Sequence, residues 1–288
     1  MPGPRLRSVL YVPGANGRAL EKARELPADA LILDLEDAVA PDAKQWAREC
    51  ACEAARSGVY AGRTVAIRIN GLGTPWHDED LTAAAAAEPE AIVVPKIGSA
   101  ADVDTVERSL EGLGAPPGVR LWAMLETPAA ILRSAEIAAA GRRLSVLVMG
   151  TNDLLAELRA GESPDRRPLE LSLTLCLLAA RAANRTILDG VYNHVRDAAG
   201  FEAECVAGRL LGFDGKTLVH PDQVEICNRV FSPSTAELEH ARRVIAEFER
   251  AARAGAGVAS LDGRLIERLH VETARRVLAQ AETAANRV

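Results

Sequence analysis

The strongest constraint on the fold of this chain is a short apolar segment that recurs eight times. Each copy is bounded by turn-forming residues, and a helical pattern follows most of them. Apolar runs of this length are typical of parallel strands buried on both faces. The expected strands are residues 8–12, 30–35, 64–70, 91–94, 120–126, 144–149, 185–191 and 215–221. Eight strand–helix units in a row predict an α/β fold of the (β/α)₈ TIM-barrel type.

Beyond the last expected strand, the pattern changes to helices. The chain has 288 residues, 48% of them hydrophobic, which is enough for one large core. We expect a barrel over residues 1–230 and a C-terminal helical arm or lid over 231–288. The arm contains a helix over 235–254, a glycine hinge at 255–257, a hairpin-like segment at 261–267 and a helix over 270–285. Such a hinge suits a lid, or an arm that packs on a neighbouring subunit, and a simple C-terminal brace fits equally well.

Charge and composition exclude several kinds of partner. The formal net charge of −6 and the acidic balance argue against nucleic acid and anionic membrane surfaces. An apolar leader and a membrane-length apolar run are both missing, so the sequence predicts a cytoplasmic protein. The five cysteines have no paired spacing and the five histidines no metal-binding spacing, which favours reduced thiols and gives zinc little support.

Polar residues cluster where the expected strands end. They are Glu36, Asp37, Arg68, Lys96, Glu126, Asp153, Asp189 and His220. TIM barrels carry their active sites at this carboxyl-terminal face, so each residue is a candidate. Local roles compete with this interpretation: a helix cap for Asp37, a surface charge for Lys96, a turn for Asp189 and a loop anchor for His220. Arg68 lies within an apolar strand and needs an anionic partner, either another side chain or a substrate carboxylate.

Glu126 and Asp153 follow the fifth and sixth expected strands. Two unpaired carboxylates that converge at one rim resist ionisation, and a cation between them would keep both charged. A small number of oxygen ligands suits Mg²⁺, which keeps its other positions for water and substrate. Alternatively, each residue only complements the amino terminus of a helix.

Six segments together resemble a known family. They are Arg7–Gly14 (RSVLYVPG), Leu33–Val39 (LDLEDAV), Ile67–Asn70 (IRIN), Leu125–Pro128 (LETP), Gly212–Lys216 (GFDGK) and His220–Gln223 (HPDQ). The chain resembles the HpcH/HpaI aldolase and citrate lyase β-subunit family, in particular its stand-alone CitE-like acyl-CoA lyases. The resemblance spans nearly the whole chain.

The resemblance implies a set of site residues. It implies Mg²⁺ held by Glu126 and Asp153, with Glu36 and Asp37 as supporting neighbours, and substrate contact by Arg68. Acyl-CoA contacts are implied for Tyr11, Arg18, Lys22, Val219 and His220, with Arg18 standing where a relative has lysine.

One segment departs from the family pattern. The family's lid carries a catalytic Asp in a G-x-M-I-D pattern, which reaches the active site of a neighbouring subunit in a trimer. Here the segment is Gly263–Glu267, so the carboxylate stands on a side chain that is one methylene longer. Glu267 is the expected acid–base catalyst, and Asp262 is the competing candidate.

These residues suit a Mg²⁺-dependent acyl-CoA lyase that cleaves a C–C bond of a 3-hydroxyacyl-CoA. The expected partners are an acyl-CoA thioester and a small 2-oxo acid, and the expected assembly is a homotrimer. Malyl-CoA would give acetyl-CoA and glyoxylate, and citramalyl-CoA would give acetyl-CoA and pyruvate. Two alternatives remain: a malyl-CoA thioesterase, and the β subunit of a citrate lyase complex. The expected CoA-phosphate contacts at Arg18 and Lys22 favour free CoA over a carrier protein.

Overall fold

The computed structural model describes residues 5–285, and the chain divides into two compact units, Met1–Phe231 and Ser232–Val288. We describe the first as the barrel unit and the second as the arm.

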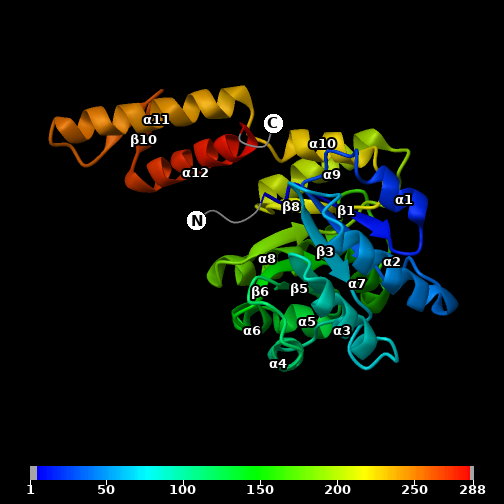
Figure 1. Ribbon diagram of the computed structural model, residues 1–288. Coiled ribbons are helices and arrows are strands. Elements are labelled where there is room, and N and C mark those ends of the chain that lie inside the picture. The colour runs from blue at the N-terminus through cyan, green and yellow to red at the C-terminus, as the bar shows by residue number, and fades with distance from the viewer. Residues whose placement is uncertain (1–4, 286–288) are drawn as a thin grey trace. The chain divides into compact units, whose positions relative to one another are not determined.

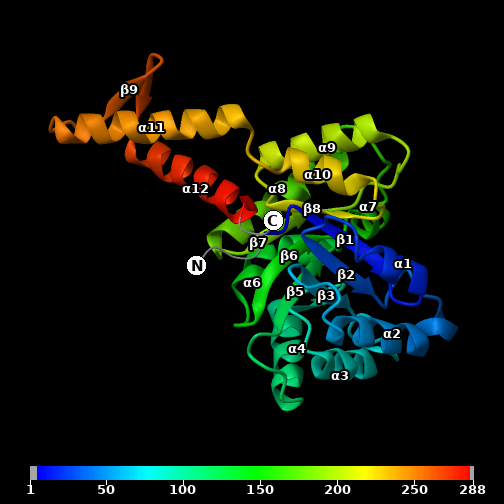
Figure 2. The same ribbon diagram turned by 45° about the horizontal axis from the view of Figure 1, so that its top comes forward.

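Eight parallel strands close into a barrel, as the sequence predicts (Figures 1 and 2). The strands are β1 (Ser8–Pro13), β2 (Ala30–Asp34), β3 (Thr64–Arg68), β4 (Ala91–Val94), β5 (Arg120–Leu125), β6 (Leu144–Met149), β7 (Thr186–Asp189) and β8 (Gly215–Leu218). Each strand pairs with the next, and β8 pairs with β1. Five strands end earlier than expected, β2 and β5 by one residue and β3, β7 and β8 by two or three, because an apolar pattern does not mark the last paired residue.

Helices connect the strands of the barrel unit. They are α1 (Gly17–Lys22), α2 (Lys44–Arg56), α3 (His77–Ala87), α4 (Ala100–Gly112), α5 (Pro128–Leu132), α6 (Ser134–Ala139), α7 (Thr151–Leu158), α8 (Glu170–Ala182), α9 (Ala198–Leu211) and α10 (Gln223–Val230), with 3₁₀ turns η1 (Pro41–Ala43) and η2 (Arg167–Leu169).

Residues 75–80 are polar and by that pattern predict a loop, and the structure shows this prediction to be wrong. Helix α3 begins at His77 and carries acidic residues at 78, 79 and 80 in its first turn, followed by an alanine-rich stretch. Acidic side chains favour a helix amino terminus, and alanine has the highest helix propensity. The polar character of these residues therefore marks the beginning of a helix.

Alternate side chains along the strands face opposite sides of the barrel wall. Val9 and Ile32 point into the barrel and join an interior cluster with Trp122 and Met124. Leu10 and Leu31 belong to the larger cluster that packs the wall against the helices. The inward-facing side chains fill the interior of the barrel, so the interior is a packed core and not a channel. Substrate can therefore be bound only at the rim, where the residues after each strand meet.

The arm has a core of its own. It consists of α11 (Thr235–Arg253), an antiparallel hairpin of β9 (Ala259–Leu261) and β10 (Arg264–Ile266), and α12 (Arg268–Ala285). Six buried apolar side chains hold these elements together: Ala241, Val244, Leu261, Ile266, Val271 and Ala274. The hairpin turns at Asp262 and Gly263, whose φ angles are 51° and 77°. Two consecutive left-handed residues form the tight hairpin turn that Asp-Gly favours.

Among the described helices, none is both long and apolar enough to traverse a lipid bilayer.

A buried ion network joins the ends of β7 and β8. The Lys216 ammonium is fully buried and lies 2.6 Å from Glu204 Oε1 and 3.1 Å from Asp189 Oδ2. Arg166 Nη1 donates to Asp189 Oδ1 at 2.7 Å. Burial alone would raise the pKa of Asp189, but Lys216 and Arg166 outweigh it and lower that pKa. Asp189 is therefore a charged, structural residue of this ion network, although its position at a strand end also made it a candidate for the active site.

Replacing Lys216 by methionine should destabilise the fold strongly. The Lys216→Met variant leaves Asp189 and Glu204 buried with only Arg166 to neutralise them, and breaking a buried ion pair costs about 3–5 kcal/mol. Urea unfolding measures the change. Arg229→Met is the control, because it breaks an exposed pair with Glu202 and should leave the unfolding midpoint close to wild type. Equal stability of the two variants would contradict a structural role for the network.

Candidate active site

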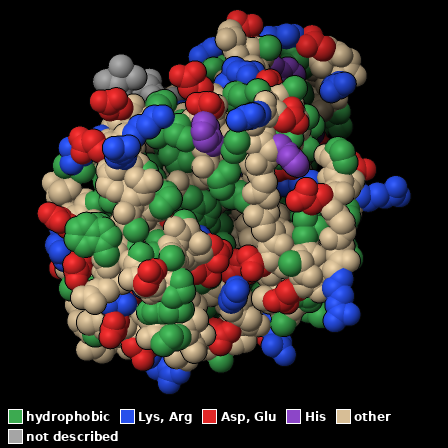
Figure 3. Space-filling view, turned by 90° about the vertical axis from the view of Figure 1, so that its right-hand side faces the viewer, with side chains coloured by type: hydrophobic (Ala, Val, Ile, Leu, Met, Phe, Trp, Pro, Cys, Tyr) green, Lys and Arg blue, Asp and Glu red, His purple; other side chains and the backbone are tan. Residues whose placement is uncertain are grey.

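Strands β2 to β6 bring five acidic and two basic side chains to one region of the rim. The acidic residues are Asp34, Glu36, Asp37, Glu126 and Asp153, and the basic residues are Arg68 and Lys96. Figure 3 shows a hollow on one face of the barrel unit, with acidic side chains (red) beside it. All the rim residues that the sequence analysis singles out on these five strands therefore belong to one electrostatic cluster.

Arg68 is anchored by a carboxylate from the neighbouring strand. Its Nε and Nη2 donate to the two oxygens of Asp34 at 2.6 and 2.7 Å, and both residues are buried. The guanidinium also lies 4.7 Å from the ring centre of Tyr11. Burial by itself would lower the pKa of Arg68, but Asp34 raises it well above its usual value. The anionic partner that the sequence requires is thus a side chain, and the remaining nitrogen, Nη1, faces Glu36 Oε2 at 2.6 Å and donates to Asp37 Oδ2 at 3.4 Å.

Glu36 occupies a position that disfavours its own charge. Its Oε2 is buried 2.6 Å from Arg68 Nη1, yet it has no hydrogen-bond partner of suitable geometry among the residues that the structure describes. Burial, with Asp37 and Asp34 nearby, raises the pKa of Glu36 to about 7, although Arg68 opposes the shift. An oxygen in this state is well suited to a further donor or cation.

Glu126 is a deeply buried acid of the cluster. It directly follows β5, is 1% exposed and accepts a hydrogen bond from the backbone N–H of Lys96 at 2.6 Å. Gly150 provides the necessary room, since a Cβ there would lie 2.3 Å from Glu126 Oε2. Burial, together with Glu36 and Asp153, raises the pKa of Glu126 to about 8. Its charge therefore needs a positive partner that the side chains do not fully supply.

Asp153 and Lys96 form the outer part of the cluster. Asp153 lies in the first turn of α7, and its Oδ1 is 3.6 Å from Lys96 Nζ. Burial alone would lower the pKa of Lys96, but Asp153, Glu36 and Glu126 raise it.

The donor set fits a Mg²⁺ ion. Among residues 5–285, no group of three or more His, Cys, Asp or Glu side chains is arranged as a complete metal cage. Mg²⁺ does not need one, because it is commonly held by one or two carboxylates and completes its coordination with water and substrate. The excess of acidic over basic groups, and the raised pKa values of Glu126 and Glu36, show that the site can accommodate added positive charge.

The residues expected to contact CoA lie on the neighbouring side of the barrel. Tyr11 is in β1, which pairs with β8, and Val219 and His220 directly follow β8. The backbone N–H groups of Val219 and His220 both donate to Gln223 Oε1, at 3.0 and 3.2 Å. Gln223 thus fixes this loop, a role that the sequence analysis does not identify.

Arg18 and Lys22 lie on α1, which follows β1. Both side chains are exposed, so two positive charges face solvent on this helix. An exposed cation on a short helix is available to a phosphate group.

Glu267 and Asp262 belong to the arm. The backbone N–H of Glu267 donates to His270 Nδ1 at 3.0 Å, and its side chain is partly exposed. Asp262 is instead held by Arg243, whose Nη2 donates to its two oxygens at 2.6 and 2.8 Å. Of the two carboxylates, Asp262 is the one engaged in an ion pair, which favours Glu267 as the candidate for proton transfer.

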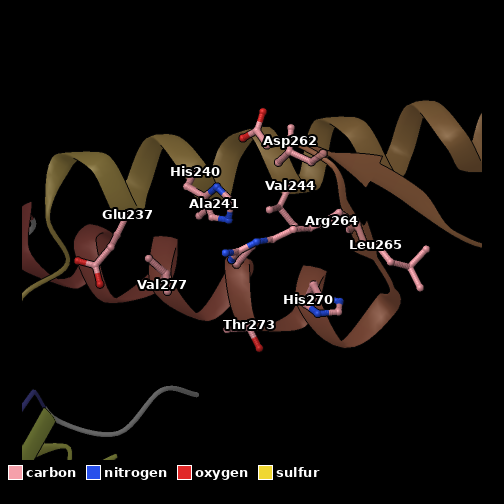
Figure 4. A pocket seen from close by; sticks show the side chains of 13 residues that line it. Glu237, His240, Ala241, Val244, Asp262, Arg264, Leu265, His270, Thr273 and Val277 are labelled. Carbon is pink, nitrogen blue, oxygen red and sulfur yellow. The ribbon is translucent and has the colours of Figure 1, made fainter. Parts of the chain in front are cut away.

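Each unit also contains a cavity that the sequence analysis does not predict. One of about 600 Å³ lies between α7, the loop before α8 and the loop after β7, and is lined in part by Asn152, Arg166, Tyr192 and His194. The other, of about 560 Å³, lies within the arm, where the side chain of Arg264 extends between α11 and α12 (Figure 4). Neither is lined by Glu126 or Asp153.

The fold and the acidic rim define the class of protein, a TIM-barrel enzyme with its candidate chemistry at the carboxyl-terminal face. Residues 7–221 match the family model of the HpcH/HpaI aldolase/citrate lyase family. Residues 170–284 match a model described as a C–C bond lyase of the TIM-barrel fold. The chain belongs to the HpcH/HpaI aldolase/citrate lyase family and is an enzyme of this carbon–carbon lyase group.

Characterised relatives match along nearly the whole chain. A (3S)-malyl-CoA thioesterase of Cereibacter sphaeroides is 52% identical over 279 residues, which cover 97% of this chain and 95% of the relative. The citrate lyase subunit beta of Escherichia coli is 37% identical over 281 residues, 96% of this chain and 93% of the relative. A solved structure of CitE from Mycobacterium tuberculosis, in complex with magnesium, acetoacetate and coenzyme A, is 29% identical with a TM-score of 0.79 and covers 96% of this chain and 97% of that one.

The buried acids predict an unusual pH dependence of stability in a chelator. Free Glu releases its proton near its usual pKa of 4.5, whereas folded Glu126 keeps its proton up to about pH 8. A raised carboxyl pKa stabilises the folded state fully below the lower value, and the contribution is lost as pH rises towards the higher one. In EDTA, the unfolding free energy should fall between pH 5 and 8, by at most about 1.4 kcal/mol per pH unit for this group.

Glu126→Gln should flatten that profile, because the amide keeps an acceptor for the Lys96 N–H but has no proton to lose. Denaturant unfolding at several pH values measures the slope. Glu136→Gln, at an exposed position of α6, should retain the slope of the wild type. Identical profiles for all three proteins would show that Glu126 ionises normally.

Proposed function

We propose that this enzyme acts on (3S)-malyl-CoA with Mg²⁺ as cofactor, and that its main reaction is hydrolysis of the thioester to malate and CoA. The observation that carries the proposal is the 52% identity, over 97% of the chain, to a protein named (3S)-malyl-CoA thioesterase. The acidic rim supports it, because this cluster has an excess of negative charge that a divalent cation would offset. The match to citrate lyase subunit beta is lower, at 37%.

Glu126 and Asp153 would hold the cation. When bound, the ion would polarise the oxygen atoms of the substrate and stabilise negative charge that develops on them. Glu126 is the rigid ligand, since it is buried and fixed by the Lys96 N–H, whereas Asp153 is the more accessible one, with about a third of its side chain exposed.

Arg68 would bind the anionic end of the substrate. Asp34 fixes two of its nitrogens, so the guanidinium cannot rotate freely, and a substrate oxygen would share Nη1 with Glu36 and Asp37. A cation held in place by a buried ion pair stabilises developing charge without having to reorganise.

The acyl-CoA would lie over the β8–β1 side of the rim. Arg18 and Lys22 would pair with its phosphates, while Tyr11, Val219 and His220 would line the path of the thioester towards the acidic cluster. Burial raises the pKa of Tyr11, so its hydroxyl stays protonated and can donate a hydrogen bond. Two cations placed for phosphates favour free CoA over a carrier protein.

Glu267 would transfer the proton, from the arm of a neighbouring subunit in a homotrimer. In hydrolysis, its carboxylate would take a proton from the water that attacks the thioester carbonyl. The thiolate of CoA would then leave and be protonated. In C–C cleavage, the substrate hydroxyl would lose its proton to solvent as the C–C bond breaks into a 2-oxo acid and the enolate of acetyl-CoA. The same carboxyl group would then deliver a proton to the α-carbon of that enolate.

Carbon–carbon cleavage is the second candidate, because both family models that match the chain are described by aldolase or lyase activity. Malyl-CoA would then yield acetyl-CoA and glyoxylate, and citramalyl-CoA would yield acetyl-CoA and pyruvate. Both reactions use the same cation site, so they differ in which bond breaks and not in which residues bind the substrate.

Product analysis distinguishes the two reactions. Purified enzyme with Mg²⁺ and (3S)-malyl-CoA should release free thiol without an equal amount of glyoxylate. Thiol is measured with a disulfide reagent and glyoxylate as its phenylhydrazone. Glyoxylate with intact acetyl-CoA would establish the lyase instead, and neither product would favour a subunit that needs a citrate lyase complex.

Removing the arm's carboxylate should abolish turnover and leave the fold intact. Glu267→Gln should lower kcat by about 10²- to 10⁴-fold, the usual contribution of a general acid–base group. Asp262→Asn is the matched control, because Asn-Gly forms the same hairpin turn as Asp-Gly. Steady-state kinetics should show near-normal kcat for the control. A larger loss in Asp262→Asn than in Glu267→Gln would assign proton transfer to Asp262.

A further inference from the structure

Lys96 contacts both of the carboxylates that would hold the cation, through different parts of the same residue. Its backbone N–H donates to Glu126 Oε1 at 2.6 Å, and its ammonium lies 3.6 Å from Asp153 Oδ1. It lies two residues beyond β4, the strand that adjoins β5, so its backbone is held by the barrel wall. The proposed function assigns Lys96 no role.

The backbone at Lys96 indicates that this position serves a specific geometry. Its φ angle is 54°, in the left-handed region that a lysine rarely adopts and glycine adopts without strain. This conformation turns the N–H towards Glu126. The side chain then leaves the wall in the direction of Asp153, with 53% of its surface still exposed.

The ammonium of Lys96 stands next to an oxygen that a bound cation would need. A positive charge close to Asp153 repels a second positive charge at the same carboxylate, and the repulsion is not fully screened at distances below a Debye length. The half-exposed side chain is long enough to move away without any change in the backbone, so the contact with Glu126 can persist.

We propose that Lys96 holds Asp153 in the metal-free enzyme, is displaced from it by the divalent cation, and then binds the carboxylate of the substrate together with Arg68. The inference rests on the proposed function, because it takes Glu126 and Asp153 as the cation's ligands. It adds an order of events. The cation binds first and releases the Lys96 ammonium from Asp153, and the free ammonium then binds the anionic substrate.

This arrangement couples the two ligands thermodynamically. If the cation frees Lys96 for the substrate, it must strengthen binding of an anionic ligand, and that ligand must strengthen binding of the cation by the same factor. In a variant without the ammonium, the cation should bind more tightly than in the wild type when no anion is present. The part of the anion's binding that depends on Lys96 should be lost.

The first experiment measures metal affinity directly, without turnover. Mn²⁺ is titrated into the metal-free protein and free Mn²⁺ is followed by electron paramagnetic resonance. Lys96→Met should bind Mn²⁺ about tenfold more tightly than wild type, from the removal of one nearby positive charge. Lys96→Arg should stay within about threefold of wild type. Lys96→Gly keeps the left-handed φ without strain and should follow Lys96→Met, which guards against an effect of misfolding.

The second experiment measures coupling to an anion. Binding of (S)-malate is titrated by calorimetry with and without saturating Mg²⁺. The factor by which Mg²⁺ strengthens malate binding should be at least fivefold smaller in Lys96→Met than in wild type. Arg108→Met, which removes one positive charge from an exposed position of α4, should change neither the metal affinity nor this factor.

The outcomes separate the inference from the function on which it rests. Tighter Mn²⁺ binding with reduced coupling in Lys96→Met supports the inference. Unchanged or weaker Mn²⁺ binding in Lys96→Met, with normal binding in wild type, overturns the inference and leaves the cation site in place. Absence of Mn²⁺ binding in wild type overturns the proposed cation site and the inference with it.

Discussion

The rim of the barrel carries more negative than positive charge, and its own basic side chains do not neutralise the excess. Arg68 binds Asp34 and also faces Glu36 and Asp37, and the Lys96 ammonium lies beside Asp153, so two basic groups must serve five acidic ones. A protein tolerates such an imbalance only where rigid surroundings impose it or a ligand relieves it. Here the closed barrel imposes it, because neighbouring parallel strands must deliver their terminal residues to one place.

Much of this could be predicted from the sequence. The fold follows from eight apolar runs, because strands buried on both faces have no polar alternation to obscure them. Glu126 was found as a candidate because it directly ends such a run, and the structure brings it together with Asp153 and Glu36. Position along a strand thus identifies which residues reach the rim, although it says nothing of how they pair there.

The missed features are charges inside or beside apolar segments whose partners are distant in sequence. Asp34 looks like one more polar residue near the end of a strand, until Arg68 is seen to bind both its oxygens from the next strand. Lys216 is paired by Glu204 and Asp189, from a helix and a strand that precede it. No local pattern encodes such pairs, because they depend on strand register and helix placement, which only the three-dimensional fold supplies.

The rim by itself explains substrate binding better than it explains the choice of bond. In the proposed site, the cation, Arg68 and Lys96 all act on substrate oxygens, and the same oxygens are present whether the C–C or the C–S bond breaks. The choice must come from where the proton goes, to the α-carbon or from a water molecule. In the proposed function, that choice would rest with Glu267, the carboxylate of the arm. Glu267 is one methylene longer than the aspartate of the family pattern, and an added methylene moves the carboxyl group by roughly one C–C bond length, about 1.5 Å. If Glu267 transfers the proton as proposed, a change of that size would alter which atom it can reach, since proton transfer requires contact within hydrogen-bond distance.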